Sequence, residues 1–278
     1  SLWSAVTKYL VPVRIEQQMS ELAVVLGARH YLREGHCFGI FQKLLRDNAI
    51  ASLFDGSTVV NLSVIIQQLR QLYAYSRKRG ASFSEEARVR LASVFDLRAT
   101  LPDFDASLLE LSNRGQDDLL ESLPSALSQV RQLVEQGELE QEVAEDLPRL
   151  LQLLMGEVSG QRARVLARGE GYGNALQQRP EMFAEAKKHC AFHGAGACVQ
   201  MWLHNREQLG EFFAGGRWLV LALHRLLQAL RPDLAMLPHS YFEKCAQEIL
   251  RLYEANQMFS LVPFRLAGTS ETGKAAFQ

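Results

Sequence analysis

The chain has 278 residues, of which 47% are hydrophobic and 22% are charged. This length allows one large domain or two small ones, and the composition excludes a disordered chain. A net charge of −1 argues against a basic protein that binds nucleic acid. No apolar run approaches the roughly 18 residues of a membrane span, so none is expected. Four cysteines are too few for a disulfide framework, which favours a reducing, cytoplasmic setting.

Charge is distributed unevenly along the chain. Residues 1–98 carry 13 basic and 8 acidic groups (+5), residues 99–160 carry 3 and 13 (−10), and residues 161–278 carry 14 and 10 (+4). The acidic middle predicts a solvated face and a boundary near residues 98–103. We therefore expect two domains, 1–98 and 99–278.

The N-terminal third shows helical periodicity. Residues 2–26 place apolar side chains three and four positions apart, and Gly27 is a plausible end for this helix. A second helix is predicted over residues 59–79, with Ser57 or Thr58 as its N-cap.

The same pattern continues to the C-terminus, with a Gly-rich loop at 168–179 and Pro180 at a first helical position. The small residues at 194–197 predict either a close helix contact or a break. No strand alternation is found, so the sequence predicts an all-α fold of helical bundles. The further predicted helices span residues 82–97, 119–136, 139–168, 180–193, 197–210, 214–230 and 240–256.

The segment KLLRDNAIASLFDGSTVVNLSVI (43–65) contains Leu45-Arg46-Asp47 and then Phe54-Asp55-Gly56-Ser57. It resembles the C-terminal helical domain of the acyl-CoA dehydrogenase family, which shows a Tyr-Arg-Asp-Ala pattern, a Tyr-Glu-Gly-Thr turn and then a helix. The upstream segment VVLGARHYLRE (24–34) is similar to the family's Gly-Gly-x-Gly-aromatic turn, with Gly27 and Ala28 in register. The resemblance covers about residues 1–72 and implies a long-chain type, in which extra helices follow the catalytic domain.

The resemblance implies a reaction. In this family a carboxylate removes the α-proton of an acyl thioester while the β-hydrogen leaves as hydride to FAD, and Asp55 is the matching base. A base for so weak an acid needs a raised pKa and a dry setting. Gly56 would bring the backbone close to the substrate. The resemblance implies flavin contacts from Ser57 and Asn61 and from the Gly27–Ala28 turn.

Several positions depart from the family pattern. Asp55 is one methylene shorter than the family's Glu, Val24 stands where a flavin-binding Gln is often found, and His30 replaces the last Gly of the turn. The other interpretation of Asp55 is a turn or N-cap residue.

The resemblance starts near the third helix of the family's four-helix bundle. Half a bundle with a bare apolar face should not be stable alone. The chain is then a fragment of a longer enzyme, one subunit of a split enzyme, or a unit in which residues 99–278 supply substitute helices. We favour the fragment.

The C-terminal part has weaker motifs. A histidine and cysteine cluster lacks paired Cys-x-x-Cys spacing, so core or surface roles are expected and no metal. The glycines at 169, 171 and 173 do not follow a strand, which favours a linker over a dinucleotide loop. An aromatic stripe predicts core packing, with a membrane surface or docking helix as the alternative. The cluster comprises His189, Cys190, His193, Cys198 and His204, and the stripe Trp202, Phe212, Phe213 and Trp218.

The resulting hypothesis is the C-terminal part of an FAD-dependent α,β-dehydrogenase acting on an acyl thioester of coenzyme A or of a carrier protein. The resemblance implies a homo-oligomer whose flavin is shared across subunits. The alternative is a non-catalytic helical docking or assembly module derived from that fold. A lipid-binding bundle is a third interpretation.

Overall fold

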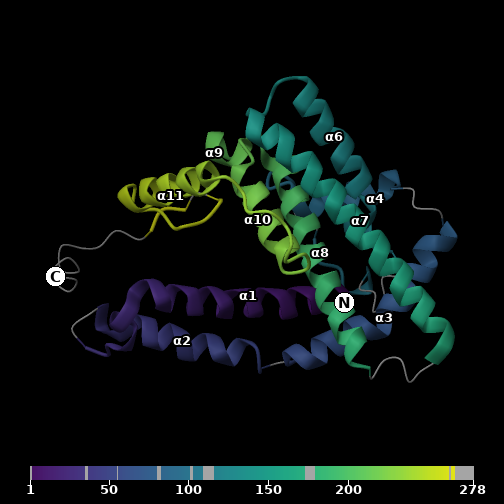
Figure 1. The fold of residues 1–278 in the computed structure, drawn as a ribbon, viewed down its shortest axis with the longest axis horizontal. Helices are drawn as coiled ribbons and strands as arrows, with labels where there is room; N and C mark the ends of the chain where they lie inside the picture. Colours follow the sequence, from purple (N-terminus) through teal and green to yellow (C-terminus); the bar gives the residue numbers. More distant parts are fainter. Residues whose placement is uncertain are drawn as a thin grey trace.

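The computed structural model describes residues 2–34, 37–54, 56–79, 83–100, 103–108, 116–172, 179–262 and 264–266. Within these ranges the protein is an all-α helical bundle, as predicted, with eleven α-helices, three short 3₁₀ helices and no β-strand (Figure 1). The α-helices are α1 (Leu2–Leu26), α2 (Ile40–Ala51), α3 (Thr58–Arg79), α4 (Glu85–Phe95), α5 (Asp118–Glu121), α6 (Leu123–Glu135), α7 (Gln141–Tyr172), α8 (Pro180–Asn205), α9 (Gly210–Ala214), α10 (Arg217–Gln228) and α11 (His239–Glu254).

Helix ends follow the signals in the sequence. Ser57 precedes α3, and its Oγ accepts a hydrogen bond from the Val60 amide at 3.4 Å. Ser84 caps α4 in the same way, accepting from the Ala87 amide at 3.2 Å. Pro180 is the first residue of α8. Side-chain oxygens at these positions satisfy amides that have no partner within the helix.

Helix α8 is continuous, whereas the sequence pattern predicts two helices for this segment. The small residues at its centre are places of close approach. A Cβ on Gly194 would lie 2.6 Å from Cδ2 of Leu10 in α1, and a Cβ on Gly196 would lie 3.1 Å from Cγ of Leu119 in α5. The predicted close contact is therefore confirmed and the predicted break is wrong, because packing outweighs the modest helix penalty of glycine.

The core has two hydrophobic clusters that share α7 and α8. The larger cluster joins α6, α10 and α11 to the first half of α7 and the second half of α8, and it includes the aromatic stripe. The smaller cluster packs α1 and α3 against Val165 of α7 and Met182, Ala186 and Cys190 of α8. Helices from the second predicted domain thus complete the core of the first, and the division near residue 98 stays a prediction.

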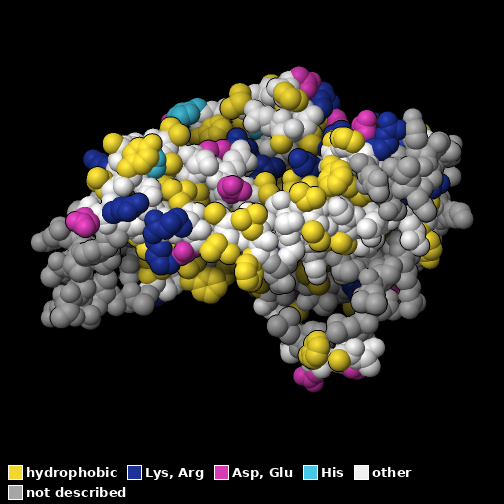
Figure 2. Space-filling view, turned by 90° about the horizontal axis from the view of Figure 1, so that it is seen from below, with side chains coloured by type: hydrophobic (Ala, Val, Ile, Leu, Met, Phe, Trp, Pro, Cys, Tyr) yellow, Lys and Arg dark blue, Asp and Glu magenta, His cyan; other side chains and the backbone are white. Residues whose placement is uncertain are grey.

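The distal half of α1 and the whole of α2 form a hairpin that extends from the bundle (Figure 1). The buried residues of α1 end at Tyr9, and α2 has none. Figure 2, seen from below, shows hydrophobic side chains exposed on this side of the molecule. Large exposed side chains of the hairpin are Val11, Ile15, Leu22, Val24, Val25, Ile40, Leu44 and Ile50. No helix in the described ranges is both long and apolar enough to cross a membrane.

Candidate functional site

The turn before α3 brings together three of the residues that the resemblance assigns. Gly56 has φ = +99°, a conformation that glycine adopts without strain. Asn61 Nδ2 donates to the carbonyl oxygens of Gly56 at 2.8 Å and Ser57 at 3.1 Å. The Asn61 amide is thereby used to close the turn, while its Oδ1 stays available.

Asp55, the predicted base, lies outside the described residues. Its neighbour Phe54 has a side chain that is 72% exposed, and Leu53 is 74% exposed. The apolar run before the turn is therefore not covered by the described part of this chain. A dry setting for a carboxylate at this turn requires a further surface packed on these side chains.

The Gly27–Ala28 turn lies at the far end of α1. Gly27 has φ = +58° and opens a 3₁₀ helix over Gly27–Tyr31, and both turn residues are exposed. Nothing lies within 4 Å of where a Cβ on Gly27 would be, so the backbone here is open to an approaching group.

The two turns do not meet within one chain. Helix α2 runs back beside α1 and separates them, with Gly27–Ala28 before its start and Gly56–Ser57 beyond its end (Figure 1). Twelve helical residues span about 18 Å. A ligand that contacts both turns of one chain must be extended, or the two turns must come from different copies.

A second group of polar residues is buried where α3, α5, α7 and α8 meet. The Tyr73 hydroxyl donates to Gln161 Oε1, and Gln161 Nε2 donates to the backbone oxygen of Glu185 at 2.6 Å. Burial and the nearby Asp117 raise the pKa of Tyr73 well above its usual value.

Glu185 joins this group to the surface. Burial acts to raise its pKa, but hydrogen bonds from Arg164 and Gln161 hold the pKa below its usual value. The Glu185 carboxylate also lies 3.3 Å from Arg168 and 3.6 Å from Lys188. Because three cations surround one carboxylate, Glu185 acts as a fixed ionic link between α7 and α8.

His189 and His193 face the same interior, as their spacing on one helix predicts. Burial lowers the pKa of His189 to about 3 and that of His193 to about 4, so both rings are neutral. Burial raises the pKa of Asp117, which faces His189, to about 6. Sequence reasoning noted the histidines but missed Asp117, Tyr73 and Gln161, since nothing in the local pattern links residues so far apart.

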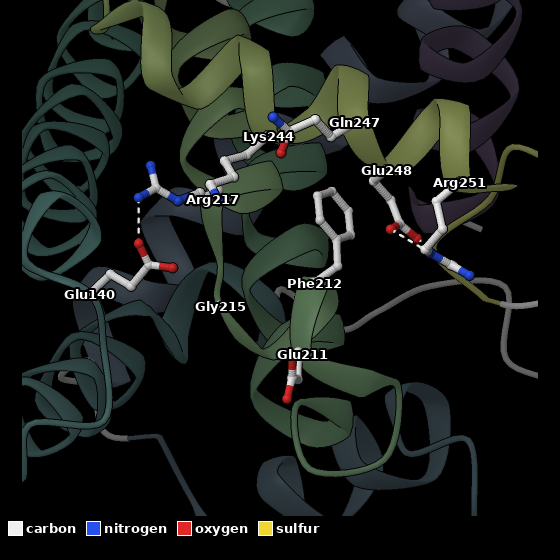
Figure 3. A pocket seen from close by; sticks show the side chains of 9 residues that line it. All are labelled: Glu140, Glu211, Phe212, Gly215, Arg217, Lys244, Gln247, Glu248 and Arg251. Carbon is white, nitrogen blue, oxygen red and sulfur yellow. Dashed lines mark hydrogen bonds and ion pairs between the residues drawn. The ribbon is translucent and has the colours of Figure 1, made fainter.

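A cleft of about 440 Å³ lies between α9, the start of α10 and α11 (Figure 3). Most of its charged groups are paired within the chain. Arg217 pairs with Glu140 and Glu142, and Arg251 donates to both carboxylate oxygens of Glu248 at 2.6 and 2.8 Å. These internal pairs engage four of the six charged residues that line the cleft.

The described residues contain no group of three or more His, Cys, Asp or Glu side chains arranged to hold a metal ion. His189, Cys190 and His193 are core residues. No family model, no curated protein and no solved structure matches this chain.

Proposed function

We propose that this chain is the C-terminal part of a flavin-dependent dehydrogenase that introduces an α,β double bond into an acyl thioester. The observation that carries the proposal is the turn at Gly56 and Ser57. Gly56, which follows Asp55 in the sequence, is left-handed, Ser57 is the N-cap of α3, and Asn61 closes the turn by donating to the Gly56 oxygen. This is where the resemblance assigns the base and part of the flavin contact.

The residues of this turn suit the roles that the resemblance assigns. Ser57 Oγ accepts from the Val60 amide, which leaves its hydroxyl proton free to donate to a ligand. Asn61 Oδ1 can accept a hydrogen bond. In the reaction, Asp55 would take the α-proton of the thioester, and FAD when bound supplies the acceptor for the β-hydride. The thioester is carried on coenzyme A or on a carrier protein.

The exposed hairpin supports the partners in this proposal. Leu53, Phe54 and the apolar side chains of α2 would be covered by the remainder of the dehydrogenase, by a partner subunit or by a second copy. Such a surface would also dry the turn that holds Asp55.

The test uses the longest natural gene product that contains this sequence. Bound flavin is measured by its visible absorbance, and turnover of an acyl thioester is followed with an artificial electron acceptor. Asp55→Asn should retain flavin and lose turnover by at least about 10²-fold, the usual contribution of a general base. Asp55→Glu restores the family's reach and should keep activity.

The matched control is Asp47→Asn, since Asp47 is an exposed carboxylate of α2 that pairs with Lys43. Its turnover should equal that of the unsubstituted protein. A flavin-free protein, or full turnover in Asp55→Asn, contradicts the proposal.

A non-catalytic assembly module is the second candidate. It is favoured by α2, which has no buried residue and so contributes more surface for docking than core. A stable complex with a second polypeptide that contains no flavin, isolated with the chain and seen by native mass spectrometry, would support this candidate over the dehydrogenase.

A further inference from the structure

Three cationic side chains converge on one buried carboxylate where the end of α7 packs against the start of α8. Glu185 Oε1 lies 3.2 Å from Arg164 Nε and 3.3 Å from Arg168 Nη1. Lys188 Nζ lies 3.6 Å from the same oxygen. The Glu185 side chain is only 3% exposed, whereas those of the three cations are 38%, 37% and 33% exposed. The carboxylate is therefore a buried anchor for cations that reach the solvent.

The cluster carries more positive charge than Glu185 can neutralise. Three cations around one carboxylate leave a net charge of +2, and none of the three is ion-paired with another carboxylate of the described residues. Residues 161–168 and 179–188, which surround the cluster, carry six basic and two acidic side chains. The second acid, Glu181, pairs with Arg179 at 3.5 Å. A field of one sign at the end of two packed helices favours the binding of an anion.

The cations also have hydrogen-bond donors to spare. Arg164 donates to Glu185 through Nε alone, so its two terminal NH₂ groups make no hydrogen bond within the described part of the chain. Arg168 donates to Glu185 through Nη1, and its Nε and Nη2 are likewise unused there. These unused nitrogens are not buried. A guanidinium with free N–H groups can donate two parallel hydrogen bonds to the oxygens of a phosphate group.

We propose that Arg164, Arg168 and Lys188 bind the phosphate group of an organic phosphate monoester. Such a group carries a charge of about −1.5 to −2 at pH 7, which matches the excess charge of the cluster. A carboxylate or a phosphodiester supplies only a single charge. Glu185 holds the three cations together against their mutual repulsion, so the site is formed before the ligand arrives and less side-chain entropy is lost on binding.

The experiment measures binding of methyl phosphate to the whole chain by isothermal titration calorimetry. The buffer has low ionic strength and a pH of about 8, where the ester is a dianion. Binding should be saturable, with a dissociation constant of roughly 1 mM or lower. Dimethyl phosphate, a diester with a single charge, should bind at least about 10-fold more weakly, because it leaves part of the excess charge unpaired.

Inorganic phosphate distinguishes the free ion from the ester. Its dissociation constant should lie within about 10-fold of that of methyl phosphate, since both present the same charged oxygens. Inorganic phosphate that binds while methyl phosphate does not would mean that the site takes the free ion, and would overturn the assignment of an ester.

Variants then locate the binding. Arg168→Gln and Lys188→Gln should each raise the dissociation constant of methyl phosphate by at least about 10-fold, because each removes a charge-assisted hydrogen bond. Arg131→Gln is the matched control, since Arg131 is an exposed arginine of α6 whose replacement changes the net charge by the same amount. Circular dichroism shows whether each variant is folded.

A measurement on the unsubstituted chain covers the case of a variant that does not fold. The NMR signals of the Nε–H groups of Arg164 and Arg168 should shift as methyl phosphate is added, and that of Arg131 should not. Absence of saturable binding overturns the inference, as do equal affinity for dimethyl phosphate or an equal effect of Arg131→Gln. None of these measurements involves flavin or a thioester, so their failure leaves the test of Asp55 untouched.

Discussion

Asp117 Oδ2 lies 3.9 Å from His189 Nε2, and both atoms are buried without a hydrogen-bond partner in the described part of the chain. The Tyr73 hydroxyl donates to Gln161, so its oxygen accepts from His189 Nδ1 at 3.1 Å. A neutral imidazole has one N–H, and Nε2 therefore presents a lone pair to Asp117. The distance would suit an ion pair, but burial disfavours both charges. The proton therefore belongs on the carboxyl below about pH 6.

This pair predicts an unusual pH effect for Asp117→Asn. The pKa of Asp117 is raised to about 6 in the folded protein from 3.8. The folded state therefore binds this proton more tightly than the unfolded state does. The resulting stabilisation of the folded protein is complete below pH 3.8 and is lost as pH rises through 6. The amide of the introduced asparagine can donate to His189 Nε2 at every pH, and its oxygen can still cap α5. As pH rises from 4 to 6, the free energy of unfolding of Asp117→Asn should therefore rise relative to that of the unsubstituted protein by on the order of 2 kcal/mol.

The measurement is urea unfolding at several pH values, followed by circular dichroism. The difference in free energy of unfolding between Asp117→Asn and the unsubstituted protein should level off above pH 6. Asp103→Asn, at an exposed carboxylate, should show no such trend. A pH-independent difference between Asp117→Asn and the original chain would mean that Asp117 is ionised throughout this range.

His193 makes stability depend on pH in the opposite direction, and His193→Phe should weaken that dependence. His193 has a pKa lowered to about 4, so it is neutral when folded and takes a proton on unfolding below its usual value of 6.5. The stabilisation of the folded state by neutral His193 is complete above pH 6.5 and is lost as pH falls through 4. Phenylalanine keeps the edge contact with Trp3, whose ring centroid lies 5.1 Å away. The variant should lose stability less steeply than the original on acidification from pH 6.5 to 4, measured by the same unfolding assay.

Two glycines should respond in opposite directions. Gly156 in α7 is exposed, and nothing lies within 4 Å of where its Cβ would be, so Gly156→Ala should stabilise by about 0.5–1 kcal/mol. Gly194→Leu would force α1 away from α8 at Leu10 and should destabilise by about 1–3 kcal/mol. Thermal unfolding of the two variants checks both signs, and equal effects would contradict the close helix contact.

Asn205 ties the end of α8 to α4. It is fully buried, its Nδ2 donates to the Phe95 oxygen at 2.7 Å, and its Oδ1 accepts from the Leu97 amide at 3.0 Å. Asn205→Ala leaves both backbone groups unpaired and should cost about 2–4 kcal/mol, summing two desolvated groups. Hydrogen exchange should become faster for the backbone amides at the C-terminal end of α4. The amides of α6, which takes no part in these hydrogen bonds, should keep their protection.

Local signals in the sequence determined most of the helices. Ser57, Ser84 and Pro180 act within a few residues of themselves, so helix starts could be predicted at these positions. The Gly56 turn belongs to the same class, because Asn61 closes it from one helical turn away. These interactions are local, and they need no knowledge of the rest of the chain.

Only the tertiary structure shows which surfaces those helices pack against. The continuity of α8 through Gly194 depends on Leu10, which is far away in the sequence. The contacts of Tyr73 with Gln161 and His189 join three helices. Burial at this junction raises the pKa of Tyr73 and lowers that of His189. Periodicity shows that a helix has an apolar face but not which surface covers it. The sequence therefore determined the helices and the turn at Gly56 and Ser57. Only packing decided that α7 and α8 complete the N-terminal core while the α1–α2 hairpin stays open.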